Sequence, residues 1–308
     1  MFNNLWVEKY RPQHLDDVIL SAENRQIVER YKRDQEIPNL LFCGNPGTGK
    51  TTLAKVIVND ILGCQYLYIN ASDENGIDTI RSKVTSFAHT RSFDGGIKVI
   101  ILDECDGLSQ DAQRALRNTM EEFAAKTRFI LTANYNHKII PALQSRCQSI
   151  DLTPPLDSCM ERIDFILHGQ GISISDEQRE DLKKFVKVNY PDLRRVINEV
   201  QKYTATGNLK LADNTSCSDI VKKVLALTLS GHVLKVRKFV IENEEKFNGD
   251  YTHLLRQLFD YMDKSKLSDT QKGMGLVIIA EAMYRSAFVV DQEINFYSCM
   301  IQLSEVKA

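Results

Sequence analysis

The strongest indication of the fold is the stretch GNPGTGKT, residues 44–51. It matches the pattern G-x-x-x-x-G-K-[ST] in full, follows the apolar run IPNLLFCG (37–44) and opens the helical pattern KTTLAKVIVNDIL (50–62). Strand, glycine-rich loop and helix in this order are typical of a phosphate-binding loop, because backbone amides and the helix N-terminus then face the phosphates. An ordinary glycine-rich turn is the alternative, and the flanking strand and helix disfavour it. The sequence therefore predicts a nucleotide site.

The residues of this loop have separate tasks in binding a nucleotide. We expect Lys50 to bridge the β- and γ-phosphates and the Thr51 hydroxyl to bind Mg²⁺. The other loop residues would surround the phosphates with their backbone amides. The expected phosphate contacts are Gly44, Asn45, Pro46, Gly47, Thr48, Gly49, Lys50, Thr51 and Thr52.

Short apolar runs alternate with helical patterns on both sides of the loop. Further strands are expected at CQYLYINAS (64–72), KVIILDE (98–104) and TRFILTANY (127–135). Helices are expected between them at IDTIRSKVTSFAH (77–89) and DAQRALRNTMEEFA (111–124). Apolar strands that alternate with helices of this length predict an α/β fold with a parallel sheet covered on both faces.

Polar residues follow two of these strands at the point where each ends. Asp103 ends an apolar strand and can hold Mg²⁺, and Glu104 after it can polarise an attacking water, which favours hydrolysis over passive binding. Asn134 ends the next strand and can position that water. The alternative is that the two acids cap a following helix and that Asn134 only ends its strand.

The character of the chain changes after DLTPP (151–155), because the β-branched runs stop and every later periodic segment is helical. A second linker is expected at NLKLADNTSCSD (208–219). The clearest later helices are SDIVKKVLALTL (218–229), YTHLLRQLFDYM (251–262) and GMGLVIIAEAMYRSAFVV (273–290). We therefore expect three domains: α/β over residues 1–153, and all-helical over 154–215 and 216–308.

Composition limits the class of protein. The chain has 308 residues, 43% apolar and 26% charged, with a formal net charge of −2, so any contact with nucleic acid must be local. Its seven cysteines include no C-x-x-C pair, which disfavours a zinc site. No apolar stretch approaches the roughly 20 residues of a membrane span, and the N-terminus is not of signal-peptide type. An intracellular, cytoplasmic protein with no membrane contact is expected.

Four stretches resemble the AAA+ clamp-loader ATPases, the replication factor C small subunits and their phage counterparts. They are WVEKYRP (6–12), ASDENGID (71–78), LDECD (102–106) and QSRC (144–147). The resemblance implies an α/β P-loop AAA+ domain with a parallel sheet, followed by an all-α lid domain and an all-α collar domain for oligomerisation. SFDGGIKVIILDE (92–104) further resembles the T-even-type phage ATPase subunit, as does NYPDLRRVINEV (189–200), which implies a phage protein in the host cytoplasm; a eukaryotic relative would be nuclear.

The resemblance also assigns residues around the nucleotide. Arg146 of QSRC would reach the γ-phosphate held by a neighbouring subunit, and Arg194 would sense the γ-phosphate in its own subunit. A solvated or structural arginine is the alternative in each case. Lys50, Glu104 and Asn134 would complete the catalytic set, with Thr51 and Asp103 on Mg²⁺ and with ATP as substrate. The adenine would lie against Val7, Glu8, Lys9, Tyr10 and Ile19.

The resemblance implies that the chain loads a sliding clamp onto primer–template DNA. Its partners would be the clamp, the DNA, further copies of itself and a non-ATPase subunit in a pentamer. DNA candidates are Arg81, Lys83, Arg114 and Arg117, for which a solvated face is the alternative. Phe93 is the candidate for the clamp, while helical spacing places Phe87 in the core. A branch-migration helicase, a protein remodeller and a subunit with a decayed site are the rival readings.

Overall fold

The computed structural model describes residues 5–74, 76–90, 96–205, 214–247, 249–265 and 267–306. The chain divides into two compact units, Met1–Lys210 and Leu211–Ala308, which are treated separately below. The predicted boundary at residue 153 lies within the first unit and stays a prediction. In the described ranges, no helix combines the length and the apolar character needed to cross a bilayer.

The first unit is built on a five-stranded sheet whose strands are β1 (Leu40–Cys43), β2 (Tyr66–Asn70), β3 (Lys98–Asp103), β4 (Thr127–Ala133) and β5 (Gln148–Asp151). Their order is β2-β3-β4-β1-β5, and every pairing is parallel. Strand β1 therefore has a neighbour on each side, with Leu40 opposite Ile130 on one side and Gln148 on the other. This order confirms the expected α/β fold class.

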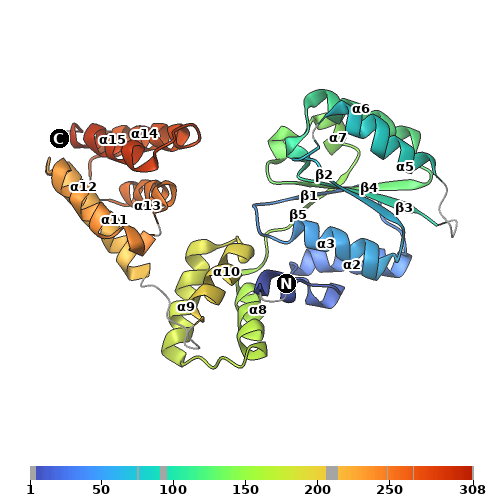
Figure 1. Cartoon of the computed structure of the whole chain (residues 1–308), viewed down its shortest axis with the longest axis horizontal. Helices are drawn as coiled ribbons and strands as arrows, with labels where there is room; N and C mark the ends of the chain where they lie inside the picture. Colours follow the sequence, from blue (N-terminus) through green and yellow to red (C-terminus); the bar gives the residue numbers. More distant parts are fainter. Residues whose placement is uncertain are drawn as a thin grey trace. The chain divides into compact units, whose positions relative to one another are not determined.

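Successive residues of the inner strands enter opposite layers, because side chains alternate across a strand. Leu40 and Phe42 pack with α2 (Ala22–Asp34) and α3 (Lys50–Val56), whereas Leu41 packs into the other layer. That layer holds α5 (Thr85–His89), α6 (Gln110–Glu122) and α7 (Pro141–Gln144), and Figure 1 shows these helices on the opposite face from α2 and α3. The inner strands β1, β3 and β4 are thus buried on both faces.

Shorter elements complete the α/β part. They are α1 (Trp6–Lys9), α4 (Ile77–Thr79), the 3₁₀ turns Leu15–Asp17, Cys105–Gly107 and Asn136–Lys138, and the π-helical turns Ile57–Ile61 and Ile80–Val84. The helices α8 (Leu156–Gly169), α9 (Asp176–Asn189) and α10 (Leu193–Tyr203) follow. Helix α1 contacts α10, where the Trp6 amide donates to Oε1 of Gln201 at 2.9 Å. The N-terminal segment is therefore anchored to the later helices.

The second unit consists of α11 (Asn214–Leu229), α12 (Val233–Glu242), a 3₁₀ turn (Glu244–Phe247), α13 (Tyr251–Asp263), α14 (Asp269–Ser286) and α15 (Gln292–Ser304). They enclose one apolar core to which Val224, Leu254 and Leu303 contribute fully buried side chains. The all-helical prediction is confirmed.

The structure differs from the sequence-based elements most clearly at β5, α11 and α14. The sequence pattern does not indicate strand β5, because only Ile150 of its four residues is buried. Helix α11 begins at Asn214, inside the segment expected to be a linker. Helix α14 starts at Asp269, where Ser268 forms a capping box with Gln271, and ends at Ser286, short of the apolar residues up to Val290.

Candidate nucleotide-binding site

The phosphate-binding loop connects strand β1 to α3, as the sequence predicts. Gly44, Gly47 and Gly49 have φ angles of +144°, +78° and +92°, a range that side-chain-bearing residues rarely adopt. The Thr48 hydroxyl donates to the Asn45 carbonyl at 3.0 Å across the loop. The glycines therefore allow the backbone to curve so that its amides face the space above β1.

Lys50 is only 7% exposed, and its ammonium lies within the loop. Its Nζ donates to the carbonyls of Gly44 and Asn45 at 2.8 Å each. Burial lowers the pKa of Lys50, while the nearby negative charge of Asp103 opposes that change. A triphosphate would give this buried cation an anionic partner, which is the expected role of Lys50.

Asp103 receives three hydroxyl donors at the end of β3. Thr51 Oγ1 donates to its two oxygens at 2.8 and 2.9 Å, Thr132 Oγ1 donates at 2.6 Å, and the Tyr68 hydroxyl donates at 2.8 Å. Burial and this bond to Asp103 raise the pKa of Tyr68. The Thr51 hydroxyl and the Asp103 carboxylate lie side by side. Both are hard oxygen ligands of the kind that Mg²⁺ prefers, so these residues fit the expected metal.

Glu104 occupies an unusual backbone position directly after β3. Its φ of +56° places a residue other than glycine in the left-handed region, where side chains are rarely found. Its amide donates to Thr132 Oγ1 at 2.9 Å, and its Oε2 accepts a 2.6 Å bond from the Ser72 hydroxyl. Thr132 thus holds the backbone of Glu104, the expected general base, and Ser72 holds its carboxylate.

Asn134 follows β4, the neighbour of both β1 and β3, so the parallel register brings it to the same sheet edge as Asp103. Its backbone N–H donates to Oδ1 of Asp106 at 3.2 Å. One cavity lies between this edge of the sheet and the phosphate loop. Its lining includes Lys50, Thr51, Asp103, Glu104, Asn134 and Arg194. Side chains far apart in the sequence therefore meet around one space.

A second, more apolar cavity adjoins the loop. Val7, Tyr10 and Ile19 line it together with Leu193 and Ile197. Glu8 and Lys9 do not line it: Glu8 pairs with Arg11 at 2.5 Å, and the Lys9 ammonium lies 5.2 Å from the centre of the Tyr10 ring. Of the five residues expected beside the adenine, the structure brings three to this cavity.

Arg194 lines both cavities, at the first turn of α10. Asp192 caps this helix by accepting from the Arg195 amide at 2.9 Å, and the cap lies against Gly47 of the loop. Arg194 is thereby held over the phosphate loop, as the expected role in its own subunit requires.

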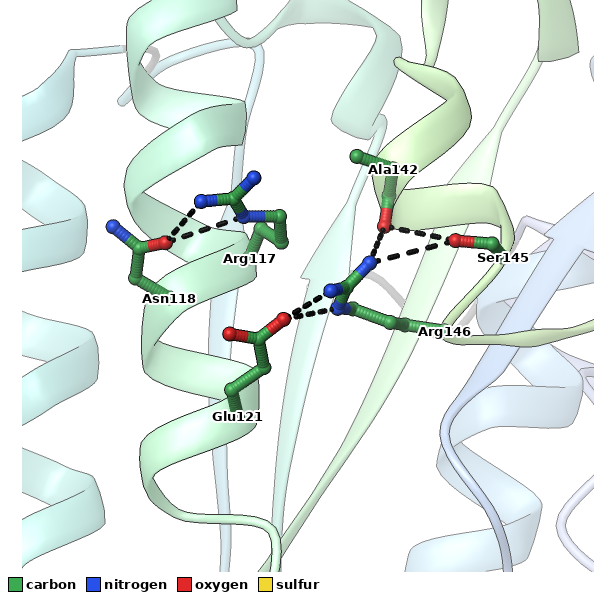
Figure 2. A network of polar contacts seen from close by, with 6 residues as sticks. All are labelled: Arg117, Asn118, Glu121, Ala142, Ser145 and Arg146. Atoms are coloured by element: carbon green, nitrogen blue, oxygen red, sulfur yellow. Dashed lines mark hydrogen bonds and ion pairs between the residues drawn. The ribbon is translucent and has the colours of Figure 1, made fainter.

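Arg146 is placed differently. It follows α7 and is absent from the described residues that line the two cavities. Figure 2 shows its guanidinium between Glu121 of α6 and the carbonyl of Ala142. The structure therefore separates Arg146 from the phosphate loop of its own chain.

Three of the DNA candidates, Lys83, Arg114 and Arg117, are on the layer that contains α6. Lys83 pairs with Glu74 at 2.6 Å, Arg114 pairs with Asp111 at 3.1 Å, and Arg117 donates to Asn118 at 2.7 Å. The Arg81 side chain and Phe93 lie outside the described residues. Phe87 is partly buried against the core, as expected.

Sequence reasoning missed several polar residues that support the site. Thr132 and Tyr68 donate to Asp103, and Ser72 donates to Glu104. The available signal was a polar residue within an apolar strand pattern, as for Thr132, which is fully buried. Gln113 and Lys98 are likewise buried polar residues with several partners.

Comparison with known proteins places this site in a family. Residues 40–154 match the family described as "ATPase family associated with various cellular activities (AAA)". The chain is 34% identical to a replication factor C small subunit of Thermofilum pendens, covering 99% of this chain and 98% of that protein. The chain belongs to the replication factor C small-subunit family. The replication factor C small subunit of Archaeoglobus fulgidus is 32% identical, with 97% of each chain covered.

A solved structure supports the same fold for this member of the replication factor C small-subunit family. A point variant of Thermotoga maritima RuvB has a TM-score of 0.57 at 18% identity, and the match covers 95% of this chain and 90% of that one. At this identity the likeness concerns the fold alone. The family members named above are archaeal, so they do not support the phage origin inferred from residues 92–104 and 189–200. Two short phrases within a shared motif set carry too little sequence to separate the branches of one family.

Proposed function

We propose that this chain is an ATP-hydrolysing subunit of a clamp loader, which places a sliding clamp on primer–template DNA during replication. The family supports this role, because its members are replication factor C small subunits. The observation that carries the proposal is that one expected catalytic residue lies apart from the others. Lys50, Asp103 and Glu104 share one cavity, while Arg146 lies away from it and is partly exposed.

The residues of the cavity suit hydrolysis at the γ-phosphate. Lys50 and the loop amides would bind the phosphates, while Thr51 and Asp103 would hold Mg²⁺, which neutralises phosphate charge when bound. Glu104 would accept a proton from the attacking water, and Asn134 would orient that water. Arg146 would complete the site of a neighbouring subunit, so that turnover depends on assembly.

The second unit has a surface suited to that assembly. Large apolar side chains are exposed along α14 and α15 and between them, namely Met274, Val277, Tyr284, Phe288, Val290, Ile294 and Ile301. Met274, Val277 and Tyr284 follow helical spacing along α14, so they share one face, and the Phe288 ring lies 5.3 Å from the Tyr284 ring. An exposed apolar face of this kind supports a subunit interface, with other copies and a non-ATPase subunit as the proposed partners.

A mixing experiment tests the proposal. Lys50→Ala should disable its own site and keep its arginine, whereas Arg146→Ala should keep its site and lose the arginine. ATP hydrolysis is measured for each variant and for the mixture, with primed DNA and sliding clamp. Activity that appears only in the mixture supports a site shared between subunits. Full activity of Arg146→Ala alone would show that Arg146 has no part in turnover.

Glu104→Gln tests the chemistry separately. It should bind ATP as the wild type does and lose turnover by at least about 10²-fold, because general bases typically contribute that much. Unchanged phosphate release would remove Glu104 from the mechanism. Loss of clamp placement on DNA, measured with labelled clamp, should accompany the loss of hydrolysis or of ATP binding.

A further inference from the structure

Glu121 holds the guanidinium of Arg146, and it comes from a different element of the same chain. Nε of Arg146 donates to Oε1 of Glu121 at 2.6 Å, and Nη2 donates to the same oxygen. On its other side, Nη1 donates to the Ala142 carbonyl at 2.8 Å. Figure 2 shows the arginine bridging α6 and α7 in this way. Two fixed acceptors on different sides of a planar group restrict its orientation.

We propose that Glu121 is the positioning residue of the Arg146 finger: it fixes the guanidinium so that the group meets the γ-phosphate of the neighbouring subunit. This inference rests on the proposed function. It assigns to a residue outside the nucleotide cavities a role in hydrolysis at another subunit's site.

The count of donors shows that Arg146 can bind Glu121 and a phosphate together. A guanidinium has five N–H donors. The bonds within the chain number four, two to Glu121, one to Ala142 and one of 3.5 Å to Ser145. One hydrogen on Nη2 therefore has no acceptor within the described ranges. Since 36% of the Arg146 side chain is exposed, that hydrogen is available to an oxygen from another molecule.

The carboxylate of Glu121 needs a positively charged partner because of its place in the helix. It lies in the last turn of α6, where the helix dipole disfavours a negative charge. Arg117, one turn earlier, does not take it: both Nε and Nη2 of Arg117 donate to Asn118. Glu121 is thus left to Arg146, as Figure 2 shows.

Stability does not account for this pair. Half of the Glu121 side chain is exposed, and ion pairs in solvent add little to the free energy of folding. What the pair does determine is geometry, because an unpaired arginine side chain samples many rotamers. Misplacement of a catalytic group by about 1 Å can reduce a rate about 10²-fold.

The test places Glu121→Ala on the chain that supplies the finger. The parent mixture combines Lys50→Ala with Arg146→Ala, and its ATPase activity comes from the Lys50→Ala chain's arginine. Replacing the first partner by Lys50→Ala/Glu121→Ala should lower kcat about 10- to 100-fold with an unchanged KM for ATP. Lys50→Ala/Glu121→Gln should restore most of the rate, because the amide oxygen still accepts from Arg146. Glu122→Ala, an exposed acid in the same turn, is the matched control and should have no effect.

Moving the substitution to the other chain separates positioning from structural damage. Arg146→Ala/Glu121→Ala has no finger to position, so its mixture with Lys50→Ala should keep the parent rate. An equal loss in both placements would show a structural role and overturn the inference, and a higher rate with the finger chain altered would show that Glu121 restrains the arginine instead. If the parent mixture is inactive although the chains co-assemble, the shared site itself is wrong, and the inference falls with it.

Discussion

The side chain of Asp192 lies against the α-carbon of Gly47, so closely that a methyl group on Gly47 would lie 1.8 Å from Oδ1 of Asp192. Asp192 is also the N-cap of α10, since it accepts from the Arg195 amide. One carboxylate therefore joins the phosphate loop to the start of α10. This contact places Arg194, two residues later, at both nucleotide cavities.

Gly47→Ala should weaken nucleotide binding at least about tenfold. The new methyl group would displace Asp192, and the φ of +78° is itself unfavourable for alanine by about 1–2 kcal/mol. Titration of a fluorescent ATP analogue measures the affinity. Gly171→Ala is the control: its φ is +70°, but no atom lies within 4 Å of the added methyl group. Equal affinities for the two variants would contradict the role of the Asp192 contact.

Ser72→Ala should raise ATP hydrolysis in the absence of DNA several-fold. The Ser72 hydroxyl donates to Oε2 of Glu104 and holds the carboxylate beside the end of β2, so this bond must break before that oxygen can turn to the attacking water. Phosphate release without DNA measures the effect, and Ser72→Thr, which keeps a hydroxyl, should resemble the wild type. A lower rate in Ser72→Ala with intact ATP binding would mean that Ser72 holds Glu104 in its working position.

Gln113→Leu should destabilise the first unit by about 2–4 kcal/mol, because it leaves buried backbone groups without partners. Gln113 is 2% exposed; it donates to the carbonyls of Leu108 and Lys138 and accepts from the Ile140 amide. Denaturant unfolding measures the loss. The exposed Gln110 of the same helix gives the control Gln110→Leu, which should change stability by about 0.5 kcal/mol or less.

The pair of His14 and Asp60 should make stability depend on pH. Its hydrogen bond of 2.8 Å raises the pKa of His14 and lowers that of Asp60. A raised histidine pKa stabilises the fold fully below the ordinary value of about 6.5, and this contribution is lost as pH rises through the raised pKa.

Thermal unfolding of wild type and His14→Gln tests this pair. The wild type should have the higher melting temperature at pH 6, and the difference should shrink by pH 9. The difference should be small, because His14 is largely exposed. It should also shrink in acid, once Asp60 is protonated. A difference that stays constant from pH 6 to pH 9 would exclude the charged pair.

Much of the sheet could be predicted because its buried strands are continuous apolar runs in the sequence. Residues 98–103 are buried on both faces, so a continuous apolar run identifies the strand without knowledge of its neighbours. Strand β5 lacks that signal, since its edge position leaves most of its side chains exposed and its identity depends on pairing with β1. The end of α14 could not be predicted from the sequence either, because apolar residues continue the helical pattern after Ser286 although the helix stops there.

Local sequence patterns were enough to predict the phosphate loop, the two acids at the end of β3 and the alternation of strands and helices along the α/β part, because glycine placement, motif spacing and apolar periodicity are local properties. Which distant side chains meet depends on the tertiary fold. Thr132 reaches Asp103 across the sheet, Asp192 reaches Gly47 from α10, and Glu121 takes the guanidinium of Arg146. These contacts depend on strand order and helix packing, which set distances between residues that no local pattern relates.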